Sequence, residues 1–528
     1  MKVVTVDEMR ALEQASEAAG VSTHQLMENA GLAVAEQARA TLGDVRGVGI
    51  TVLVGPGNNG GDGLVAARHL ADWGAWVTLY LCARRSETEP NYRLALERNA
   101  QALSMDTDAP GAGLQRALAS SRMVIDAVFG TGAVRPFQGN LQRTMLLVQQ
   151  ALASRPDLVI LAVDLPSGLN ADTGAVDPAT LVADVTVCLG YPKVGMFEFP
   201  GAERIGRLEV VDIGIPAKAA ESVHREIITQ EWAAAHAPSR PMNAHKGTFG
   251  KAMIVAGSIN YIGAAALACA AASRVGAGLV TLATPESLVP VFGARLTETT
   301  YLPLKEAEPG VLHPEAADQL CEALDGYSAV LIGCGLGQRP QVAEFVRRFL
   351  LSPSKGLALP TVIDADGLNN LAKVKDWWTH MRAEAVLTPH PGEMARLLDV
   401  PMEQVRAGRF ALAQEQAKTW RKHVVLKGAF TAIASPEGEL RISPVANPAL
   451  ATAGTGDVLA GAIAGLMAQG MTPYDAATLG VYVHGRAGER VRERLGVTGV
   501  VASDLLPELP LVFKELAEGI AAGPSRSE

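Results

Sequence analysis

The chain has 528 residues, more than one ordinary hydrophobic core accommodates, so we expect two domains. Hydrophobic residues make up 48% and charged residues 19% of the sequence, a composition that favours a folded globular protein and excludes a disordered one. The net charge of −9, without a run of Lys or Arg, excludes nucleic acid as the expected partner.

Three further features favour a cytoplasmic location. The five cysteines are scattered without CxxC spacing, and their odd number argues against a disulfide framework, as in a reducing cytosol. The first residues, MKVVTVDEMRALEQ, become charged too early for a signal peptide, and no apolar run has the length of a membrane span. We therefore expect no membrane partner.

The N-terminal half begins with two predicted helices and continues as alternating strands and helices. Thr5-Val6-Asp7-Glu8 has the spacing of a capping box, and a second helix is expected to begin near Ser22. The short apolar runs that follow predict a parallel sheet with helices on both faces, in which ligands gather at the carboxyl ends of the strands. The predicted strands are residues 50–54, 76–81, 123–127, 158–163, 182–189 and 208–211.

A polar stretch, residues 217–240, interrupts this rhythm. It contains Pro238 and lacks a convincing strand that ends in a ligand-binding loop, so we place the boundary there, with domains at residues 1–220 and 221–528. The α/β rhythm then restarts. The predicted strands with their loops are residues 251–258, 278–285, 329–337, 361–368, 385–393 and 423–434, and a long helix is expected over residues 457–469.

The first candidate site follows the first strand, in the segment GPGNNGGDG. Gly55, Gly57 and Gly60 satisfy the pattern GxGxxG, in which backbone N–H groups bind phosphate at a helix N-terminus. A Rossmann oxidoreductase would also need an acidic residue after the second strand, where this chain has Arg84 and Arg85. An arginine there could bind a 2′-phosphate, so an NADP-dependent dehydrogenase stays open as an alternative.

Oxygen-bearing side chains at three strand ends point instead to a cation and a polar substrate. Asn59 and Asp62 lie in the glycine loop, Asp126 precedes FGTG, and Asp164 and Ser167 lie in DLPSG. Oxygen ligands without His or Cys suit a hard cation rather than zinc. Each Asp could equally cap a helix, and NNGG could be only a tight turn, but three such strand ends together favour a site.

Four motifs of this half, LMENAG, GPGNNGGDG, DAVFGTG and DLPSGLNADTG, closely resemble the YjeF N-terminal domain, the NAD(P)H-hydrate epimerase family, over residues 1–216. The resemblance implies a Rossmann-like three-layer sandwich that interconverts the R and S epimers of NADHX and NADPHX at the hydrated ring carbon. It implies potassium bound by Asn59, Asp126 and Ser167. The residues that it implies for the hydrate are Asn58, Asn59, Gly60, Gly61, Asp62, Gly130, Thr131, Gly132, Ala133, Val134, Arg135, Pro136 and Asp164. We hypothesise that Asp164 transfers the proton, because it is the strand-end carboxylate not taken as a potassium ligand.

The second candidate site is centred on Gly454-Thr455-Gly456-Asp457, at the start of the long predicted helix. Small residues there expose backbone N–H groups at the positive end of the helix dipole, where a phosphate in transfer can bind. Asp457 could take a proton from a substrate hydroxyl or merely cap the helix. Lys427 could reach nucleotide phosphates or be an ordinary solvated lysine, and His390 could contact substrate or belong to the surface. No Walker A pattern is present, which excludes a P-loop enzyme.

GTGD with this strand order is typical of ribokinase-like folds. The motifs HKGTFG, GSINYIGAAAL, GAGLVTLATP, GCGLG, LTPHPGE, LKGAFT and NPALATAGTGDVLAG strongly resemble the YjeF C-terminal domain over residues 225–515, with Cys334 where we expect Pro. This is the ADP-dependent NAD(P)H-hydrate dehydratase family. The resemblance implies a ribokinase-like α/β domain that dehydrates the S hydrate to NADH or NADPH while ADP gives AMP and phosphate, with Mg²⁺ accompanying the nucleotide. The residues that it implies are Gly335, His390 and Asp457 for the hydrate and Lys427, Gly428, Ala429, Phe430, Thr431 and Gly456 for the nucleotide.

The sequence as a whole therefore predicts an α/β protein of two fused enzyme domains, in which the epimerase supplies the epimer that the dehydratase uses. We hypothesise that Asp457 is the base for phosphorylation of the substrate hydroxyl, which turns it into a good leaving group. A ribokinase-like vitamin or sugar kinase with an accessory domain and a non-catalytic nucleotide sensor stay open as alternatives. The expected partners are NADHX, NADPHX and ADP, and a homo-oligomer is expected.

Overall fold

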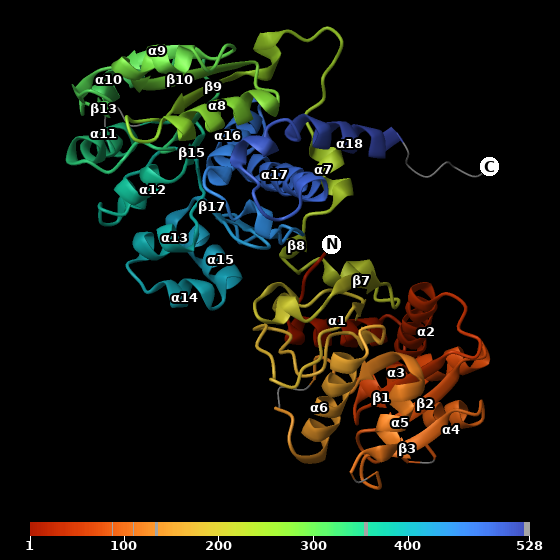
Figure 1. The fold of residues 1–528 in the computed structure, drawn as a ribbon. Helices are drawn as coiled ribbons and strands as arrows, with labels where there is room; N and C mark the ends of the chain where they lie inside the picture. Colours follow the sequence, from red (N-terminus) through yellow and green to blue (C-terminus); the bar gives the residue numbers. More distant parts are fainter. Residues whose placement is uncertain (87, 109, 133–135, 353–356, 522–528) are drawn as a thin grey trace. The chain divides into compact units, whose positions relative to one another are not determined.

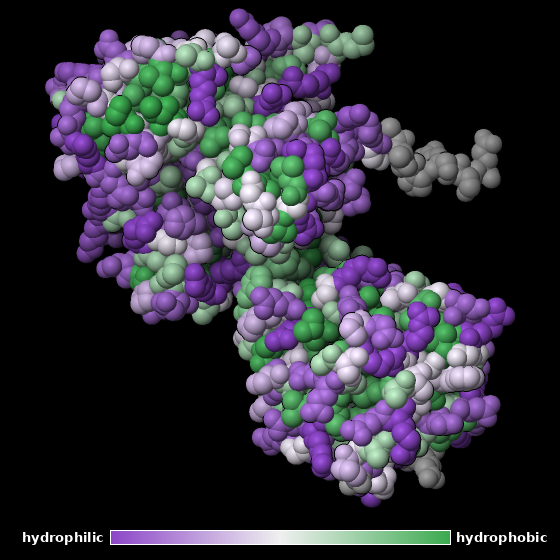
Figure 2. All heavy atoms as spheres, viewed as in Figure 1, coloured by the Kyte–Doolittle hydropathy of each residue, from purple (hydrophilic) through white to green (hydrophobic). Residues whose placement is uncertain are grey.

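The computed structural model describes residues 1–86, 88–108, 110–132, 136–352 and 357–521. The chain divides into two compact units, Met1–His224 and Arg225–Glu528 (Figure 1). Each unit is built around its own sheet. Among the described residues, no helix combines the length and the apolar character needed to cross a membrane. In the view of Figure 2, hydrophilic residues on each unit are interspersed with small apolar patches.

The first unit contains a seven-stranded sheet in which every pair of neighbouring strands is parallel. The strand order is β3-β2-β1-β4-β5-β6-β7, so consecutive βα units run outward in both directions from β1. The strands are β1 (Gly49–Val54), β2 (Trp76–Leu81), β3 (Gln101–Ser104), β4 (Ser121–Ala127), β5 (Val159–Val163), β6 (Val185–Leu189) and β7 (Arg207–Val211).

Helices bury both faces of this sheet. Val52 of β1 belongs to a core that includes residues of α1 (Val6–Ala18), α2 (Thr23–Leu42), α3 (Asn58–Asp72) and α4 (Pro90–Leu96). The next residue, Leu53, belongs to a second core with α5 (Ala112–Ser120) and α6 (Gly139–Ser154). Successive strand residues point to opposite faces, which is why neighbouring positions enter different cores. The predicted three-layer α/β sandwich is confirmed.

The local signals at the N-terminus are also confirmed. The Thr5 hydroxyl accepts a hydrogen bond from the backbone of Glu8, whose carboxylate accepts one from the backbone of Thr5, so α1 begins with a capping box. Ser22 caps α2. The short strand β3 was not predicted, and the predicted strand 182–189 begins only at Val185.

The second unit contains a ten-stranded sheet, which is parallel in its centre. The order is β11-β10-β9-β14-β15-β16-β17-β18-β19-β8, with antiparallel pairs between β17, β18 and β19. The polar stretch 217–240, in which no strand was expected, contributes β8, whose three residues are too few to show a pattern. The strands are β8 (Arg225–Ile227), β9 (Lys251–Val255), β10 (Leu279–Pro285), β11 (Thr300–Leu304), β14 (Ala329–Ile332), β15 (Thr361–Ile363), β16 (Ala385–Leu387), β17 (His423–Leu426), β18 (Ala432–Ala434) and β19 (Leu440–Ile442), and a separate pair is formed by β12 (Glu306–Glu308) and β13 (Val311–Leu312).

Three helices, α8 (Ile262–Arg274), α16 (Thr455–Ala468) and α17 (Pro473–Leu495), form the main core against one face of this sheet. Small residues let α8 and α16 pack closely, since a Cβ at Gly465 would lie 2.7 Å from the Ala272 carbonyl oxygen. The predicted long helix is α16. The other helices are α7 (Gln230–His236), α9 (Val289–Gly293), α10 (Ala316–Glu322), α11 (Pro340–Leu351), α12 (Asp366–Leu371), α13 (Pro391–Leu398), α14 (Met402–Arg406), α15 (Arg409–Trp420) and α18 (Leu509–Ala521).

Candidate functional sites

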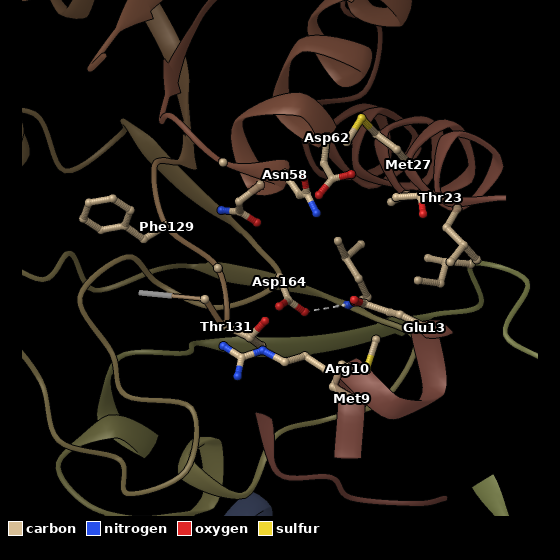
Figure 3. Close-up of a pocket in the computed structure, with 18 of the residues that line it drawn as sticks. Met9, Arg10, Glu13, Thr23, Met27, Asn58, Asp62, Phe129, Thr131 and Asp164 are labelled. Carbon is tan, nitrogen blue, oxygen red and sulfur yellow. Dashed lines mark hydrogen bonds between the residues drawn. The ribbon is translucent and has the colours of Figure 1, made fainter. Parts of the chain in front are cut away.

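A cavity of about 610 Å³ lies in the first unit, beside α1 and α2 and the loops that follow β1, β4 and β5. Figure 3 shows Asn58, Asp62, Thr131 and Asp164 around it. The predicted hydrate-binding residues that line the cavity are Asn58, Asn59, Asp62, Gly130, Thr131, Gly132 and Asp164.

The other predicted hydrate-binding residues are not part of the cavity wall. Gly60 and Gly61 are buried in the first turn of α3, and Pro136 is exposed. Ala133, Val134 and Arg135 lie outside the described residues.

The glycine loop after β1 is held by Arg85. Its guanidinium donates to the carbonyl oxygens of Gly55 (3.1 Å from Nε) and Gly57 (2.9 Å) and to the Glu89 carboxylate (2.6 Å). A Cβ at Gly60 would overlap the Gly55 carbonyl oxygen and the Arg85 guanidinium, so this glycine is needed for the close approach. Because Arg85 is occupied in this way, it is not available for a 2′-phosphate, and of the two arginines that left an NADP-dependent dehydrogenase open only Arg84 is exposed.

The three predicted potassium ligands lie around the loop that follows β4. Ser167 Oγ donates to Asp126 Oδ1 (2.6 Å), Ser167 N donates to Asp126 Oδ2 (2.8 Å), and Phe129 N donates to Ser167 Oγ (2.8 Å). The side chain of Asn59 lies against the same loop, because a Cβ at Gly130 would be 3.1 Å from Asn59 Oδ1. The structure thus brings Asn59, Asp126 and Ser167 to one place.

This cluster is buried and not fully paired. Burial raises the pKa of Asp126, although hydrogen bonds from Ser167 and Val128 act in the opposite direction. The buried amide nitrogen of Asn59 has no hydrogen-bond partner among the described residues. An acidic group in such surroundings favours a bound cation or a retained proton.

Asp164 forms an ion pair with Lys193, a residue that the sequence reasoning missed. Lys193 is fully buried, and its Nζ also donates to the Leu189 carbonyl oxygen (3.2 Å). Burial alone would lower the pKa of Lys193, but the Asp164 carboxylate more than offsets this and raises it, so Lys193 is cationic. Asp164 has a φ of +66°, a strained value for a residue other than glycine, and accepts from Leu189 N (3.2 Å).

Three further carboxyl groups line the same cavity, those of Glu13 and Glu17 from α1 and of Asp62 from α3. Figure 3 shows Glu13 and Asp62. Burial, and after it the charge of Asp164, raises the pKa of Asp62 well above its ordinary value. The pKa of Glu13 is raised by the same two causes in the same order. Both Asp62 and Glu13 are therefore harder to ionise than ordinary carboxyl groups.

The second unit brings together Asp457, Asp364 and Cys334. One ligand atom of each lies within 4.8 Å of the others, and Cys334 Sγ donates to Asp364 Oδ2 (3.8 Å). Asp457 lies in the first turn of α16, which follows Gly454 at a φ of +92°. Burial and, after it, the Asp364 carboxylate raise the pKa of Asp457 to about 6. A carboxyl with this pKa can accept a proton at neutral pH.

Lys427, at the end of β17, connects this centre to the predicted nucleotide loop. Its Nζ donates to Asp364 Oδ1 (2.7 Å) and lies 3.7 Å from Glu393 Oε2. A Cβ at Gly456 would be 3.3 Å from Lys427 Nζ, so the ammonium faces the N-terminus of α16. Lys427 is thus not a surface lysine, and its charge lies where a phosphate would bind.

The remaining predicted nucleotide residues form the turn between β17 and β18. The Thr431 hydroxyl donates to the Gly428 carbonyl oxygen (2.8 Å), and the Ala429 carbonyl accepts from Arg409. Phe430 has a φ of +53°. These contacts close a compact turn directly after Lys427.

His390 and Gly335 lie close to the same centre. His390 caps α13, where its Nδ1 accepts from Gly392 N (3.0 Å), and its Nε2 lies 3.4 Å from the buried Glu393. Burial and then Lys427 lower the pKa of His390, which favours the neutral ring. Gly335 has a φ of +66°, and its carbonyl accepts from Ser258 Oγ (2.7 Å). A smaller cavity of about 230 Å³ is lined by other residues, including Ser258, Gly337 and Asp366.

Several residues of the candidate sites were not predicted from the sequence, and they differ in whether a sequence pattern could have identified them. Asp364 ends a strand before a loop, as Asp126 and Asp164 do, so the same rule could have identified it. Lys193 has no comparable signal, because its partner Asp164 lies 29 residues earlier. Glu13 occupies a helix whose periodicity indicates only packing.

Comparison with known proteins identifies two family models on this chain. The model described as NAD(P)H-hydrate dehydratase matches residues 252–511, and the model described as YjeF-related protein N-terminus matches residues 23–195. The two matches fall in different compact units.

Curated relatives match over the full length of the chain. A protein of Moorella thermoacetica named bifunctional NAD(P)H-hydrate repair enzyme Nnr is 39% identical, with 100% of both chains covered. A protein of the same name from Thermofilum pendens is 38% identical over 98% of this chain and 97% of its own. The solved ADP/ATP-dependent NAD(P)H-hydrate dehydratase of Bacillus subtilis, co-crystallised with ATP and Mg²⁺, is 33% identical and covers 55% of this chain and 98% of its own, with a TM-score of 0.48.

Proposed function

Since this chain belongs to the family of bifunctional NAD(P)H-hydrate repair enzymes, we propose that its first unit carries the epimerase site and its second unit the dehydratase site. The chain is an enzyme that epimerises NAD(P)H hydrates and dehydrates them to NAD(P)H. The observation that carries the division of labour is that each unit has its own carboxylate centre, around Asp164 in one and Asp457 in the other.

In the epimerase site, Asp164 is the residue that transfers a proton during epimerisation at the hydrated carbon of the nicotinamide ring. It lines the cavity, and the Lys193 ammonium holds its carboxylate in position. Residues 58–62 and 130–132 would hold the rest of the hydrate, with Asn58 and Thr131 supplying polar groups.

Potassium would be held by Asn59, Asp126 and Ser167. These residues fit such an ion, because each has a side-chain oxygen atom that can ligate a hard cation, and the Asp126 carboxylate is fully buried. The ion would supply positive charge against Asp126 and so order the loops after β1 and β4.

In the dehydratase site, Asp457 takes the proton of the substrate hydroxyl as that oxygen attacks the terminal phosphorus of ADP. The bond from the bridging oxygen to this phosphorus breaks, and AMP leaves. The phosphorylated hydroxyl then departs as phosphate while the neighbouring carbon loses a proton, which forms the ring double bond of NADH or NADPH. Lys427 and the backbone N–H groups at the start of α16 bind the phosphates, and Mg²⁺ would accompany the nucleotide.

The test is recovery of reduced-nicotinamide absorbance from a mixture of R and S NADHX by the purified chain with ADP. Full conversion is expected, because the R epimer can be recovered only through the S form. Conversion that stops at the S fraction, after correction for spontaneous epimerisation, would contradict the epimerase site. No conversion with ADP or ATP would contradict the dehydratase and favour a small-molecule kinase.

A further inference from the structure

The buried ion pair between Lys193 and Asp164 borders the cavity of the first unit, because Asp164 is one of the residues that line it. The Lys193 ammonium is satisfied on several sides, by Asp164, by the Leu189 carbonyl oxygen at 3.2 Å and by Cys188 Sγ at 3.7 Å. Its backbone is anchored as well, because Pro192 O accepts from Val4 N (2.9 Å) and Val194 N donates to Val4 O (3.1 Å). A buried ion pair is a weak source of stability, so its position at the cavity points to a functional role.

Asp62 faces the same space from the second turn of α3, and no described residue forms an ion pair with it. Figure 3 shows its carboxyl on the opposite side of the cavity from Asp164. Both side chains are 7% exposed, so each keeps a small accessible surface toward the cavity. The two carboxyls therefore occupy different electrostatic surroundings although they border one cavity. The charged and titratable groups around the pair are Arg10, Glu13 and Glu17 from α1, Asp62 from α3, and Cys188 and Lys193 from β6 and the loop after it.

We propose that Asp62 is the proton donor and Asp164 the proton acceptor of the epimerase reaction, with Lys193 as the positioning residue that holds the Asp164 carboxylate through their ion pair. This inference rests on the proposed epimerase function and deepens it. Its physical basis is that two carboxyls in one site divide acid and base roles when their surroundings favour opposite protonation states. The raised pKa of Asp62, which burial and then Asp164 produce, agrees with the geometry.

The reaction balances without any redox partner. In the hydrate, which forms by addition of water to an enamine, the hydroxyl is bound to the carbon next to the ring nitrogen. Asp62 gives its proton to that hydroxyl, the C–O bond breaks, water leaves, and the nitrogen lone pair forms a C=N bond. Water then adds to the opposite face, the C=N electron pair returns to nitrogen, and Asp164 accepts the released proton. One proton has then moved from Asp62 to Asp164. Proton exchange with solvent, or the reverse reaction, restores the initial protonation of the two carboxyl groups.

The first experiment compares Asp62→Asn with the wild type. Separated R and S NADHX are interconverted without nucleotide, so that the dehydratase is idle, and the epimers are quantified by chromatography. Loss of a positioned proton donor is expected to reduce kcat by at least about 100-fold, while KM changes less than about threefold. The matched control is Asp72→Asn on the same helix, whose side chain is 45% exposed and pairs with Arg98 on the surface. It should epimerise at the wild-type rate.

The second experiment uses Lys193→Met, which keeps an unbranched side chain and removes the charge. If the ion pair with Lys193 positions the Asp164 carboxylate, kcat of the epimerase should fall by at least about 10-fold in this variant, while KM changes less than about threefold. A merely structural role would lower the unfolding temperature without lowering kcat at temperatures where the variant is folded. Thermal unfolding of both variants is measured in parallel.

The outcomes separate this inference from the function on which it rests. A wild-type chain that does not interconvert the epimers overturns the proposed epimerase itself. A wild-type chain that does so, together with near-normal kcat in Asp62→Asn, overturns Asp62 as the donor. A folded Lys193→Met variant with near-normal kcat overturns the role of Lys193.

Discussion

The Asp457 carboxyl has surroundings that suit it to accept a proton near neutral pH. Burial and, after it, Asp364 raise its pKa to about 6, although the Cys334 thiol and the Lys427 ammonium act in the opposite direction. A base with a pKa just below the working pH is ionised and still a useful proton acceptor. Cys334, which stands where proline was expected, is thus in contact with the catalytic centre.

Replacement of Asp457 by Asn should abolish this acceptor and leave the binding groups in place. We expect the rate of S-NADHX dehydration to fall by at least about 100-fold, with nucleotide binding retained in calorimetry. A base acts only when ionised, so kcat/KM of the wild type should rise as the pH increases through about 6 and then level off. Normal turnover by the variant, or a profile that is flat through this pH, would refute the assignment.

Asp126 provides a test of the potassium site that does not depend on catalysis. Because its carboxylate is fully buried, a bound cation should stabilise the folded first unit, by about 2.7 kcal/mol when the ion is at 100 times its dissociation constant. Thermal unfolding in KCl should therefore occur at a higher temperature than in choline chloride of equal ionic strength. The difference should vanish in Asp126→Asn. An equal difference in the variant would argue against a cation at this position.

At the scale of elements, the contact between α8 and α16 supports the dehydratase centre from behind. Asp457 lies at the start of α16, and the packing of this helix on α8 fixes where that start lies. Gly461 is one of the contacts, because a Cβ there would overlap the Ala268 carbonyl oxygen. Glycine is unfavourable inside a helix by about 0.5–1 kcal/mol relative to alanine, so only the packing explains it.

Two Gly→Ala substitutions should therefore change stability in opposite directions. Gly461→Ala should destabilise the second unit by about 1–3 kcal/mol through overpacking. Gly263→Ala on α8, where a Cβ would meet nothing within 4 Å, should be neutral or stabilise by up to about 1 kcal/mol. Denaturant unfolding with tryptophan fluorescence measures both. Equal effects of the two substitutions would show that helix propensity, and not the contact, decides.

At the scale of the whole molecule, the chain consists of two units with separate sheets and separate carboxylate centres. The residues on either side of the boundary belong to different units. Val223 is buried in the core of the first unit, and its carbonyl accepts from Lys2 Nζ (2.7 Å), whereas Arg225 begins a strand of the second sheet. Homo-oligomerisation stays a prediction.

Separation of the chain between His224 and Arg225 should yield two active proteins. We expect residues 1–224 to epimerise NADHX without nucleotide and residues 225–528 to dehydrate only the S epimer with ADP. A fragment ending at residue 220 should unfold at a lower temperature than residues 1–224, because burial of Val223 contributes about 1.5–3 kcal/mol. Loss of either activity on separation would show that the units depend on each other.

Local sequence determined many of the strands, two helix starts and several residues of the candidate sites. Apolar runs followed by Gly, Asp or Pro loops predicted the central parallel strands of both sheets, and the Thr5 and Ser22 caps predicted two helix starts, since these features depend on neighbouring residues only. Polar residues at strand ends predicted Asn59, Asp126, Asp164 and Ser167 for the same reason. The strands β3, β8, β11 and β19 were not predicted, because three to five residues are too few to show a clear periodicity.

Only the tertiary structure decided which charges meet. Lys193 pairs with Asp164, Lys427 with Asp364, and Arg85 with the glycine loop, and each contact joins residues far apart in the chain. The ionisation of Asp62 and Asp457 likewise follows from burial and from neighbours on other elements. The physical reason is that hydrophobic periodicity and capping are properties of a few consecutive residues, whereas electrostatic surroundings arise only after distant segments have packed together.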